Sequence, residues 1–245
     1  DRGICPTQWQ KQQIPSEFHN KIEVLHDGID TEYFVPDQNA IFKIPNSNIT
    51  LTANDEVVTY ATRGMEPYRG FPQFMEIAEK LLKRRPNLHI VIGGEDRVCY
   101  GPKLVNTTYK ELMLKKCDLD MDRVHFTGGL PYMEYKKLLQ ISSVHVYLTY
   151  PFILSWSLLE AMSSGCCVVT SDTAPVREVI KNNYNGVLVD FYDIDKFVNT
   201  IDSLLNDSIT SQKLKQKARN TILSSYNLKS LLPKHIMILK NLSRK

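Results

Sequence analysis

Two arginines in the segment YATRGMEPYRGF, residues 60–71, are of a type and spacing that could bind phosphate. Arg63 precedes Gly64 and Arg69 precedes Gly70, just ahead of a predicted helix. Guanidinium groups beside the free N–H donors of a helix start form an anion site suited to a phosphate or diphosphate. Two solvated surface arginines would give the same pattern, so both interpretations stay open here. No GxGxxG or GxxxxGK[ST] motif occurs, which counts against a dinucleotide fingerprint and a P-loop.

A glutamate stands in an otherwise apolar stretch of YPFILSWSLLEAMSSGCCVVTSD. The pattern predicts a loop that runs to Trp156 and then a helix, with Ser155 or Ser157 as its N-cap. Glu160 is then expected in the first turn, where the helix dipole stabilises a carboxylate. A carboxylate can accept two hydrogen bonds from a diol such as a ribose. It could equally be a capping-box glutamate that reaches back to Ser157.

Glycines end two further predicted strands. Gly93 and Gly94 follow an apolar run and allow backbone to approach a ligand closely, whereas Arg97 after them is interpreted as a loop charge. Gly128 ends the strand of HFTGGLPYMEY. His125 in that strand is interpreted as a core histidine with a hydrogen-bond partner rather than a catalytic one.

These candidate residues all follow predicted strands, and the strands alternate with helices. Apolar runs predict strands at 57–61, 88–92, 124–127, 144–149, 168–171 and 187–189, with helix-period segments between them. This alternation predicts an α/β fold, a Rossmann-like doubly wound parallel sheet with helices on both faces. Such sheets bind ligands at the carboxyl ends of their strands, so the four loops are expected to meet there.

Composition excludes several classes of protein. The chain has 245 residues, 42% hydrophobic and 23% charged, with a net charge of +3, so neither disorder nor a nucleic-acid partner is expected. Its most apolar stretch, 144–154, is too short to span a membrane. The five cysteines contain no CxxC pair, which argues against a zinc site and favours a reducing, cytoplasmic location.

We divide the chain into four parts. Residues 1–36 are predicted to be the end of a preceding domain, 37–55 a polar linker, 56–207 a nucleotide-sugar-binding domain and 208–245 two helices with a break near Pro233. Because the chain begins with Asp1, we expect it to be a piece of a longer protein. The tail contains a basic group, interpreted either as a solvated helix face or as a peripheral contact with the inner face of a membrane. This group comprises Lys213, Lys215, Lys217 and Arg219.

The four loops in this order resemble the C-terminal half of a retaining GT-B glycosyltransferase of family four, over residues 5–205. HDGID is similar to the NG-V-D turn between the two domains, and TRGMEPYRG to the GR…KG diphosphate loop, with Arg69 in the place of lysine. HFTGGLP is similar to the F-x-G loop that contacts the base, and FILSWSLLE to EGFGLPLLE. In the family pattern a glutamate for the donor sugar stands eight residues before Glu160, and this sequence has Phe152 there.

The resemblance implies a function and a site. A nucleotide-diphosphate sugar of UDP or GDP type would be the donor, with no cofactor and no metal, because Arg63 and Arg69 would neutralise the diphosphate. Transfer would proceed with retention to a glycan or lipid-linked acceptor held by a missing N-terminal domain, so that this fragment alone is inactive. The implied catalytic residues are Arg63, Arg69 and Glu160. The implied donor-binding residues are Gly64, Gly93, Gly94, Gly128, Leu130, Phe152, Leu154, Ser155, Trp156 and Ser157.

Two other interpretations stay open. Phe152 motivates a non-catalytic nucleotide- or partner-binding domain on the same fold. A different GT-B enzyme, an epimerase or a phosphorylase, is the third, although LLEAM-SG and the absence of a pyridoxal lysine motif count against it.

Overall fold

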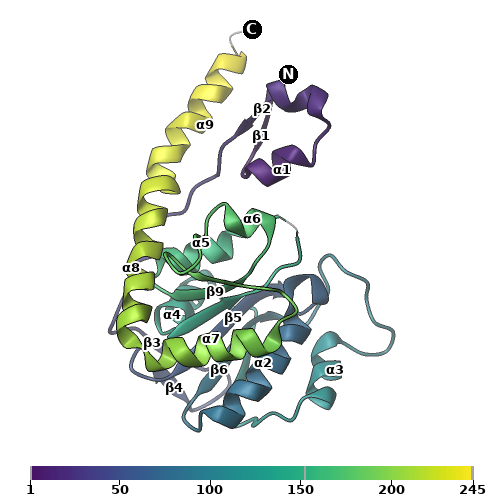
Figure 1. Cartoon of the computed structure of the whole chain (residues 1–245), viewed down its shortest axis with the longest axis vertical. Helices are drawn as coiled ribbons and strands as arrows, with labels where there is room; N and C mark the ends of the chain where they lie inside the picture. Colours follow the sequence, from purple (N-terminus) through teal and green to yellow (C-terminus); the bar gives the residue numbers. More distant parts are fainter. Residues whose placement is uncertain (1, 152, 244–245) are drawn as a thin grey trace.

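A computed structural model of the chain describes residues 2–151 and 153–243. Its centre is a sheet of six parallel strands in the order β10-β9-β8-β5-β6-β7. The expected doubly wound α/β fold is therefore confirmed (Figure 1). The strands are β5 (Val57–Gly64), β6 (His89–Glu95), β7 (Val124–Gly128), β8 (Val144–Tyr147), β9 (Cys167–Ser171) and β10 (Val187–Val189).

Helices cover both faces of this sheet because its strands are apolar on both sides. On one face pack α2 (Phe71–Arg84), α3 (Tyr109–Lys116) and α7 (Ile194–Asn206). On the other pack α4 (Tyr132–Gln140) and α5 (Trp156–Ser163). The amphipathic pattern of α2 puts seven side chains into the core, while its lysines and Arg84 face solvent.

The order of the strands reverses between β5 and β8. From β5 the chain winds outward through β6 to β7, then returns to β8 and winds the other way through β9 to β10. Loops that leave the carboxyl ends of β5 and β8 therefore diverge to opposite faces and leave a crevice between them. This reversal positions the candidate site.

The stretch 37–55, expected to be a polar linker, instead forms a hairpin that packs on the sheet. β3 (Ile41–Lys43) pairs antiparallel with β4 (Thr50–Thr52). One side of the hairpin is buried against α4 and against Val57 and Val91 of the sheet, so the segment belongs to the same core. The buried hairpin residues are Ala40, Phe42, Ile44 and Leu51. The sequence analysis missed the alternation of these apolar residues with polar ones, because asparagines and prolines surround them.

The C-terminal tail forms two helices, as expected, but the break between them is elsewhere. α8 (Ser208–Ser225) and α9 (Leu228–Ser243) are separated at residues 226–227, and Pro233 lies inside α9. Ile29 pairs with the backbone on both sides of the break: its N–H donates to the carbonyl of Tyr226, and its carbonyl accepts the N–H of Leu228. This tertiary pairing takes the place of the helical hydrogen bonds and ends α8.

The predicted basic face of the tail is also divided. Arg219 points inward, and its guanidinium donates to the carbonyls of Thr31, Phe34 and Ser163. It thereby ties α8 to α5 and to the segment that precedes the hairpin. The basic group is therefore not a single solvated or membrane-facing surface.

The N-terminal segment lies on the same side of the molecule as α9 (Figure 1), and Leu25, which follows it, packs on Leu231 and Ile238 of that helix. β1 (Gly3–Cys5) pairs parallel with β2 (Ile22–Val24), and α1 (Gln8–Gln12) and a 3-10 turn (Ser16–Lys21) connect them. Glu178, next to the short helix α6 (Ala174–Arg177), accepts the N–H groups of Gln8 and Trp9 at 2.8 and 2.6 Å. This contact attaches the N-terminal segment to the large sheet's domain. The division into domains stays a prediction.

Candidate functional site

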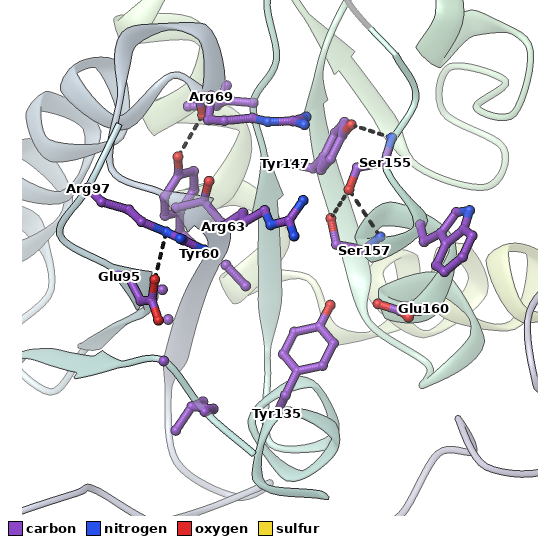
Figure 2. Close-up of a pocket in the computed structure, with 18 of the residues that line it drawn as sticks. Tyr60, Arg63, Arg69, Glu95, Arg97, Tyr135, Tyr147, Ser155, Ser157 and Glu160 are labelled. Atoms are coloured by element: carbon purple, nitrogen blue, oxygen red, sulfur yellow. Dashed lines mark hydrogen bonds and ion pairs between the residues drawn. The ribbon is translucent and has the colours of Figure 1, made fainter. Parts of the chain in front are cut away.

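A cavity of about 770 Å³ opens at the point where the strand order reverses. The carboxyl ends of β5, β6 and β8 form its floor, and the starts of α4 and α5 form one wall. Figure 2 shows the side chains that converge on it. It is lined by Tyr60, Ala61, Thr62, Arg63, Arg69, Gly93, Gly94, Glu95, Arg97, Tyr100, Gly129, Leu130, Tyr132, Tyr135, Tyr147, Leu148, Ser155, Trp156, Ser157 and Glu160.

Both predicted phosphate-binding arginines reach into this cavity. Arg63 comes from the end of β5 and Arg69 from the 3-10 turn Pro67–Arg69 that follows, and their guanidinium groups point toward the start of α5 (Figure 2). The hydroxyl of Tyr60 donates to the carbonyl oxygen of Arg69 at 2.6 Å. The ring of Tyr100 lies 5.1 Å from the Arg69 guanidinium carbon. These contacts hold the backbone and the side chain of Arg69 at the cavity wall.

A buried carboxylate joins the two loops that carry these groups. Glu66 is fully buried, and its Oε2 accepts the N–H groups of Tyr100 and Gly101 at 2.9 and 2.8 Å. Gly70 next to Arg69 has a φ of +68°, and a Cβ there would lie 2.4 Å from Cβ of Leu148. Only glycine fits this turn, so the sequence pattern Arg-Gly reflects a close approach of the loop to β8.

The start of α5 supplies backbone donors on the opposite wall. Ser155 is the N-cap, and its side chain accepts the N–H of Ser157. The backbone N–H of Ser155 donates to the hydroxyl of Tyr147 at 3.0 Å. The indole N–H of Trp156 donates to Asp27 at 3.2 Å, so this wall also contacts the segment between β2 and the hairpin. The first N–H groups of a helix favour an anion.

Glu160 lies further along α5 than expected. Its position fits neither the predicted first-turn carboxylate nor the capping-box glutamate. Because Ser155 is the N-cap, Glu160 is past the first turn, and the capping-box position is occupied by Leu158. The residue is 6% exposed, and its carboxylate accepts a 2.6 Å hydrogen bond from the hydroxyl of Tyr132. Burial raises the pKa of Glu160, an effect that the tyrosine hydroxyls of Tyr132 and Tyr135 oppose. The capping-box alternative and the stabilisation by the helix dipole were therefore wrong.

Most of the predicted site residues line the cavity. They are Arg63, Arg69, Gly93, Gly94, Leu130, Ser155, Trp156, Ser157 and Glu160. Gly64 lies outside it, packed against the backbone of Arg97, and Gly128 forms the turn before Gly129, which does line the cavity. Leu154 is buried in the apolar cluster around α5. Phe152 lies outside the described residues.

Several cavity residues were missed from the sequence. Glu95 and Arg97 form an ion pair at 2.6 Å, although Arg97 was interpreted as a simple loop charge. The tyrosines of the lining were all missed: Tyr60, Tyr100, Tyr132, Tyr135 and Tyr147. Tyr132 and Tyr135 could have been predicted from the sequence. They are three residues apart at the start of a helix that follows a glycine-ended strand, so both face the same side of that helix at the carboxyl edge of the sheet.

Metal ligands do not gather in the part of the chain that the structure describes. Within residues 2–151 and 153–243, no group of three or more histidine, cysteine, aspartate or glutamate side chains could hold a metal ion. His125 is buried and hydrogen-bonded to His89 at 3.0 Å, at the opposite end of its strand from the glycine loop.

Two family models match the chain. Residues 44–221 match the model described as glycosyl transferases group 1, and residues 1–34 match one described as the glycosyl transferase family 4 group. Among curated proteins, a D-inositol 3-phosphate glycosyltransferase of Corynebacterium efficiens is 23% identical over 81% of this chain and 46% of its own length. A UDP-Gal:alpha-D-GlcNAc-diphosphoundecaprenol alpha-1,3-galactosyltransferase of Escherichia coli is 26% identical over 85% of this chain. The chain spans 51% of that protein, about half its length.

Solved structures share the fold at low identity. Sucrose-phosphate synthase from Thermosynechococcus elongatus superposes with a TM-score of 0.79 at 17% identity, over 98% of this chain and 58% of its own. Anabaena HepE in complex with UDP-glucose superposes with a TM-score of 0.76 at 17% identity, over 97% of this chain and 63% of its own. The architecture is that of one half of a GT-B glycosyltransferase. Because the first model matches most of its length, the chain belongs to the glycosyl transferases group 1 family.

Proposed function

We propose that the chain is the donor-binding half of a retaining glycosyltransferase that uses a nucleotide-diphosphate sugar of UDP or GDP type. The observation that carries this proposal is the cavity itself. Two arginines line one wall of it, and α5 lines the opposite wall with its first N–H groups and with the buried carboxylate of Glu160. That arrangement suits a ligand with a diphosphate at one end and a sugar diol at the other.

The arginines would supply the chemistry of the leaving group. A nucleoside diphosphate leaves readily only when its developing negative charge is neutralised, and Arg63 and Arg69 carry permanent positive charges. The N–H groups at the start of α5 would add fixed dipoles on the opposite wall. With these groups in place, transfer needs no metal ion for charge neutralisation, and no cofactor takes part.

The other end of the cavity would bind the nucleoside. Glu160 would accept the ribose hydroxyls, and the loop with Gly129 and Leu130 would contact the base through its backbone. The resemblance to HepE, solved with UDP-glucose, supports a nucleotide sugar as the donor.

We further propose that an N-terminal domain holds the acceptor and packs beside α9. β1 and β2 form a two-stranded parallel sheet, and such sheets are ordinarily covered on both faces. Apolar side chains are exposed there and along α9, among them Ile4, Val24, Leu232, Ile236 and Leu239. Without that domain the chain would bind donor but not transfer it.

The acceptor would be a glycan or a lipid-linked sugar. The name of the Escherichia coli relative includes a diphosphoundecaprenol-linked sugar, which supports the lipid-linked class. Within the described residues no helix is long and apolar enough to cross a membrane. We propose a cytoplasmic enzyme that touches the inner membrane face peripherally, through exposed lysines such as Lys213 and Lys217.

Titration calorimetry tests the donor site. UDP, GDP and ADP are titrated into the chain, and UDP or GDP is expected to bind with a one-to-one stoichiometry. Absence of binding by all three would refute the proposal. In the intact protein, hydrolysis or transfer from UDP- or GDP-sugars would exclude the binding-only alternative that Phe152 motivates.

A further inference from the structure

Glu160 is flanked by two tyrosines from one face of α4. Tyr132 and Tyr135 are three residues apart, so both side chains reach the same wall of the cavity. The Tyr132 hydroxyl donates to Oε1 of Glu160 at 2.6 Å. In Figure 2 the hydroxyl of Tyr135 points into the same part of the cavity. We call Glu160 with these two residues the tyrosine clamp.

Tyr132 is held in place from behind. Its ring stacks on that of Tyr33, with centroids 5.4 Å apart and planes 9° from parallel, and meets the ring of Phe34 edge-on at 5.2 Å. Asp30 in turn fixes the backbone of that segment by accepting the N–H groups of Glu32 and Tyr33 at 3.0 Å. A tyrosine that is 55% exposed would otherwise rotate freely. The aromatic stack removes that freedom before a ligand arrives.

We propose that Tyr132 is a positioning residue for the donor's ribose: it holds the Glu160 carboxylate at an angle from which the remaining acceptor sites meet the 2′ and 3′ hydroxyls. This inference rests on the proposed donor site and adds to it a residue with an assigned role. A carboxylate has about four acceptor sites, so one hydrogen bond from Tyr132 leaves enough for a diol.

The hydrogen bond from Tyr132 also favours the ionised form of the carboxylate, because it opposes the rise in the pKa of Glu160. Burial raises the pKa of Glu160, and the hydrogen bond from Tyr132 and the nearby hydroxyl of Tyr135 lower it. Tyr33 and Asp30 lie behind Tyr132. They contribute to the raised pKa of the Tyr132 hydroxyl and do not contact the carboxylate of Glu160 directly. A protonated Glu160 would offer fewer acceptors, so ribose recognition would weaken as the pH falls.

Tyr132→Phe tests the role without removing the ring stack. Calorimetry compares UDP and GDP with their 2′,3′-dideoxy counterparts, so that contacts to phosphate and base cancel. Affinity for the ribonucleotide is expected to fall about tenfold, the effect of one hydrogen bond to a charged group, and affinity for the dideoxy analogue less than about twofold. Tyr184→Phe, an exposed tyrosine outside the cavity, is the matched control and should change neither.

The pH profile provides a readout that a purely structural residue would not move. The ratio of ribonucleotide to dideoxynucleotide affinity is measured from pH 8 to pH 5, because the two ligands share their phosphate titration. The ratio should fall with decreasing pH, and its midpoint should lie at higher pH in Tyr132→Phe than in wild type. In Glu160→Gln the ratio should be low and independent of pH.

A second variant tests the support behind the clamp. Tyr33→Leu keeps an apolar contact but loses the stack, and should lower ribonucleotide affinity in the wild-type background but not further in Tyr132→Phe. Tighter ribonucleotide binding by Tyr132→Phe, or equal losses for both ligand types, would overturn the role of Tyr132. Failure of wild type to bind any nucleoside diphosphate would instead overturn the proposed donor site, and the clamp's role with it.

Discussion

At the scale of single residues, the site combines permanent charge with a buried, titratable carboxylate. Arg63 and Arg69 were identifiable from their place beside glycines ahead of a helix, and both reach the cavity. Glu160 was identifiable from its apolar surroundings, but its hydrogen-bond partner was not, because Tyr132 is 28 residues earlier in the chain. A sequence pattern shows neighbours along one element only.

The arginines should bind the diphosphate separately and measurably. Arg63→Ala or Arg69→Ala is expected to cost about 1.5–3 kcal/mol of nucleoside diphosphate affinity, the usual contribution of a hydrogen bond to a charged group. Calorimetry with UDP and GDP measures it. Arg84→Ala is the control, because Arg84 is the last residue of α2, lies outside the cavity and donates to Asn199 of α7. Unchanged binding by the double variant would refute the assignment.

Chelation tests the proposed independence from metal. With Arg63 and Arg69 in the role of the cation, UDP or GDP should bind the chain equally well in excess EDTA and in magnesium or manganese. The measurement is the dissociation constant in each buffer. A loss of binding in EDTA that added metal restores would contradict the proposal.

At the scale of elements, the loops around the cavity are fixed by contacts with one another and with the starts of α4 and α5. The loop after β5 returns toward β8 at Gly70, and Glu66 joins it to the loop after β6. Asp27 connects the segment before the hairpin to the start of α5, and Tyr33 connects it to the start of α4. The donor cavity is thus built from loops that hold one another.

Alanine substitutions at Gly70 and Gly128 distinguish the cost of a strained backbone from the cost of a steric clash between the new Cβ and its neighbours. Gly70 and Gly128 have nearly the same φ, +68° and +67°, but a Cβ meets Leu148 at 2.4 Å in the first and nothing within 4 Å in the second. Gly128→Ala should therefore cost about 1–2 kcal/mol of unfolding free energy, and Gly70→Ala clearly more. Urea unfolding measures both. Equal costs would show that the approach of the loop to β8 is not a close one.

At the scale of the whole molecule, the sheet is a continuous apolar core that contains a fully buried histidine. His145 of β8 is hydrogen-bonded through Nδ1 to the hydroxyl of Thr59 at 2.8 Å, and burial lowers its pKa from 6.5 to about 4. The folded state keeps the ring neutral where the unfolded chain binds a proton. The contribution of His145 to the free energy of unfolding is therefore fully present above pH 6.5, and it is lost as the pH falls toward about 4.

The expected loss from His145 is about 3 kcal/mol across that interval. His89 and His125, whose pKa values burial also lowers, act in the same direction. Urea unfolding between pH 7 and pH 4.5 measures the slope in wild type and in His145→Gln. The variant should show a shallower slope, whatever its stability at pH 7, and an unchanged slope would rule out His145 as the source.

The sequence by itself determined the order of strands and helices, the winding of the sheet and the loops that meet at its carboxyl edge. These follow from local patterns, since apolar runs and helix periods lie within single elements. It also marked Arg63, Arg69 and the start of α5 as parts of one site.

Only the tertiary structure decided how distant segments meet. The hairpin at 37–55 was hidden by its polar flanks, and the break between α8 and α9 is set by backbone pairing with Ile29 rather than by Pro233. Arg219 points inward because three carbonyls from two other segments converge on it. Glu160 is a clamped carboxylate rather than a helix cap because α4 brings Tyr132 to it. Each of these depends on contacts between residues far apart in the chain, which no local spacing encodes.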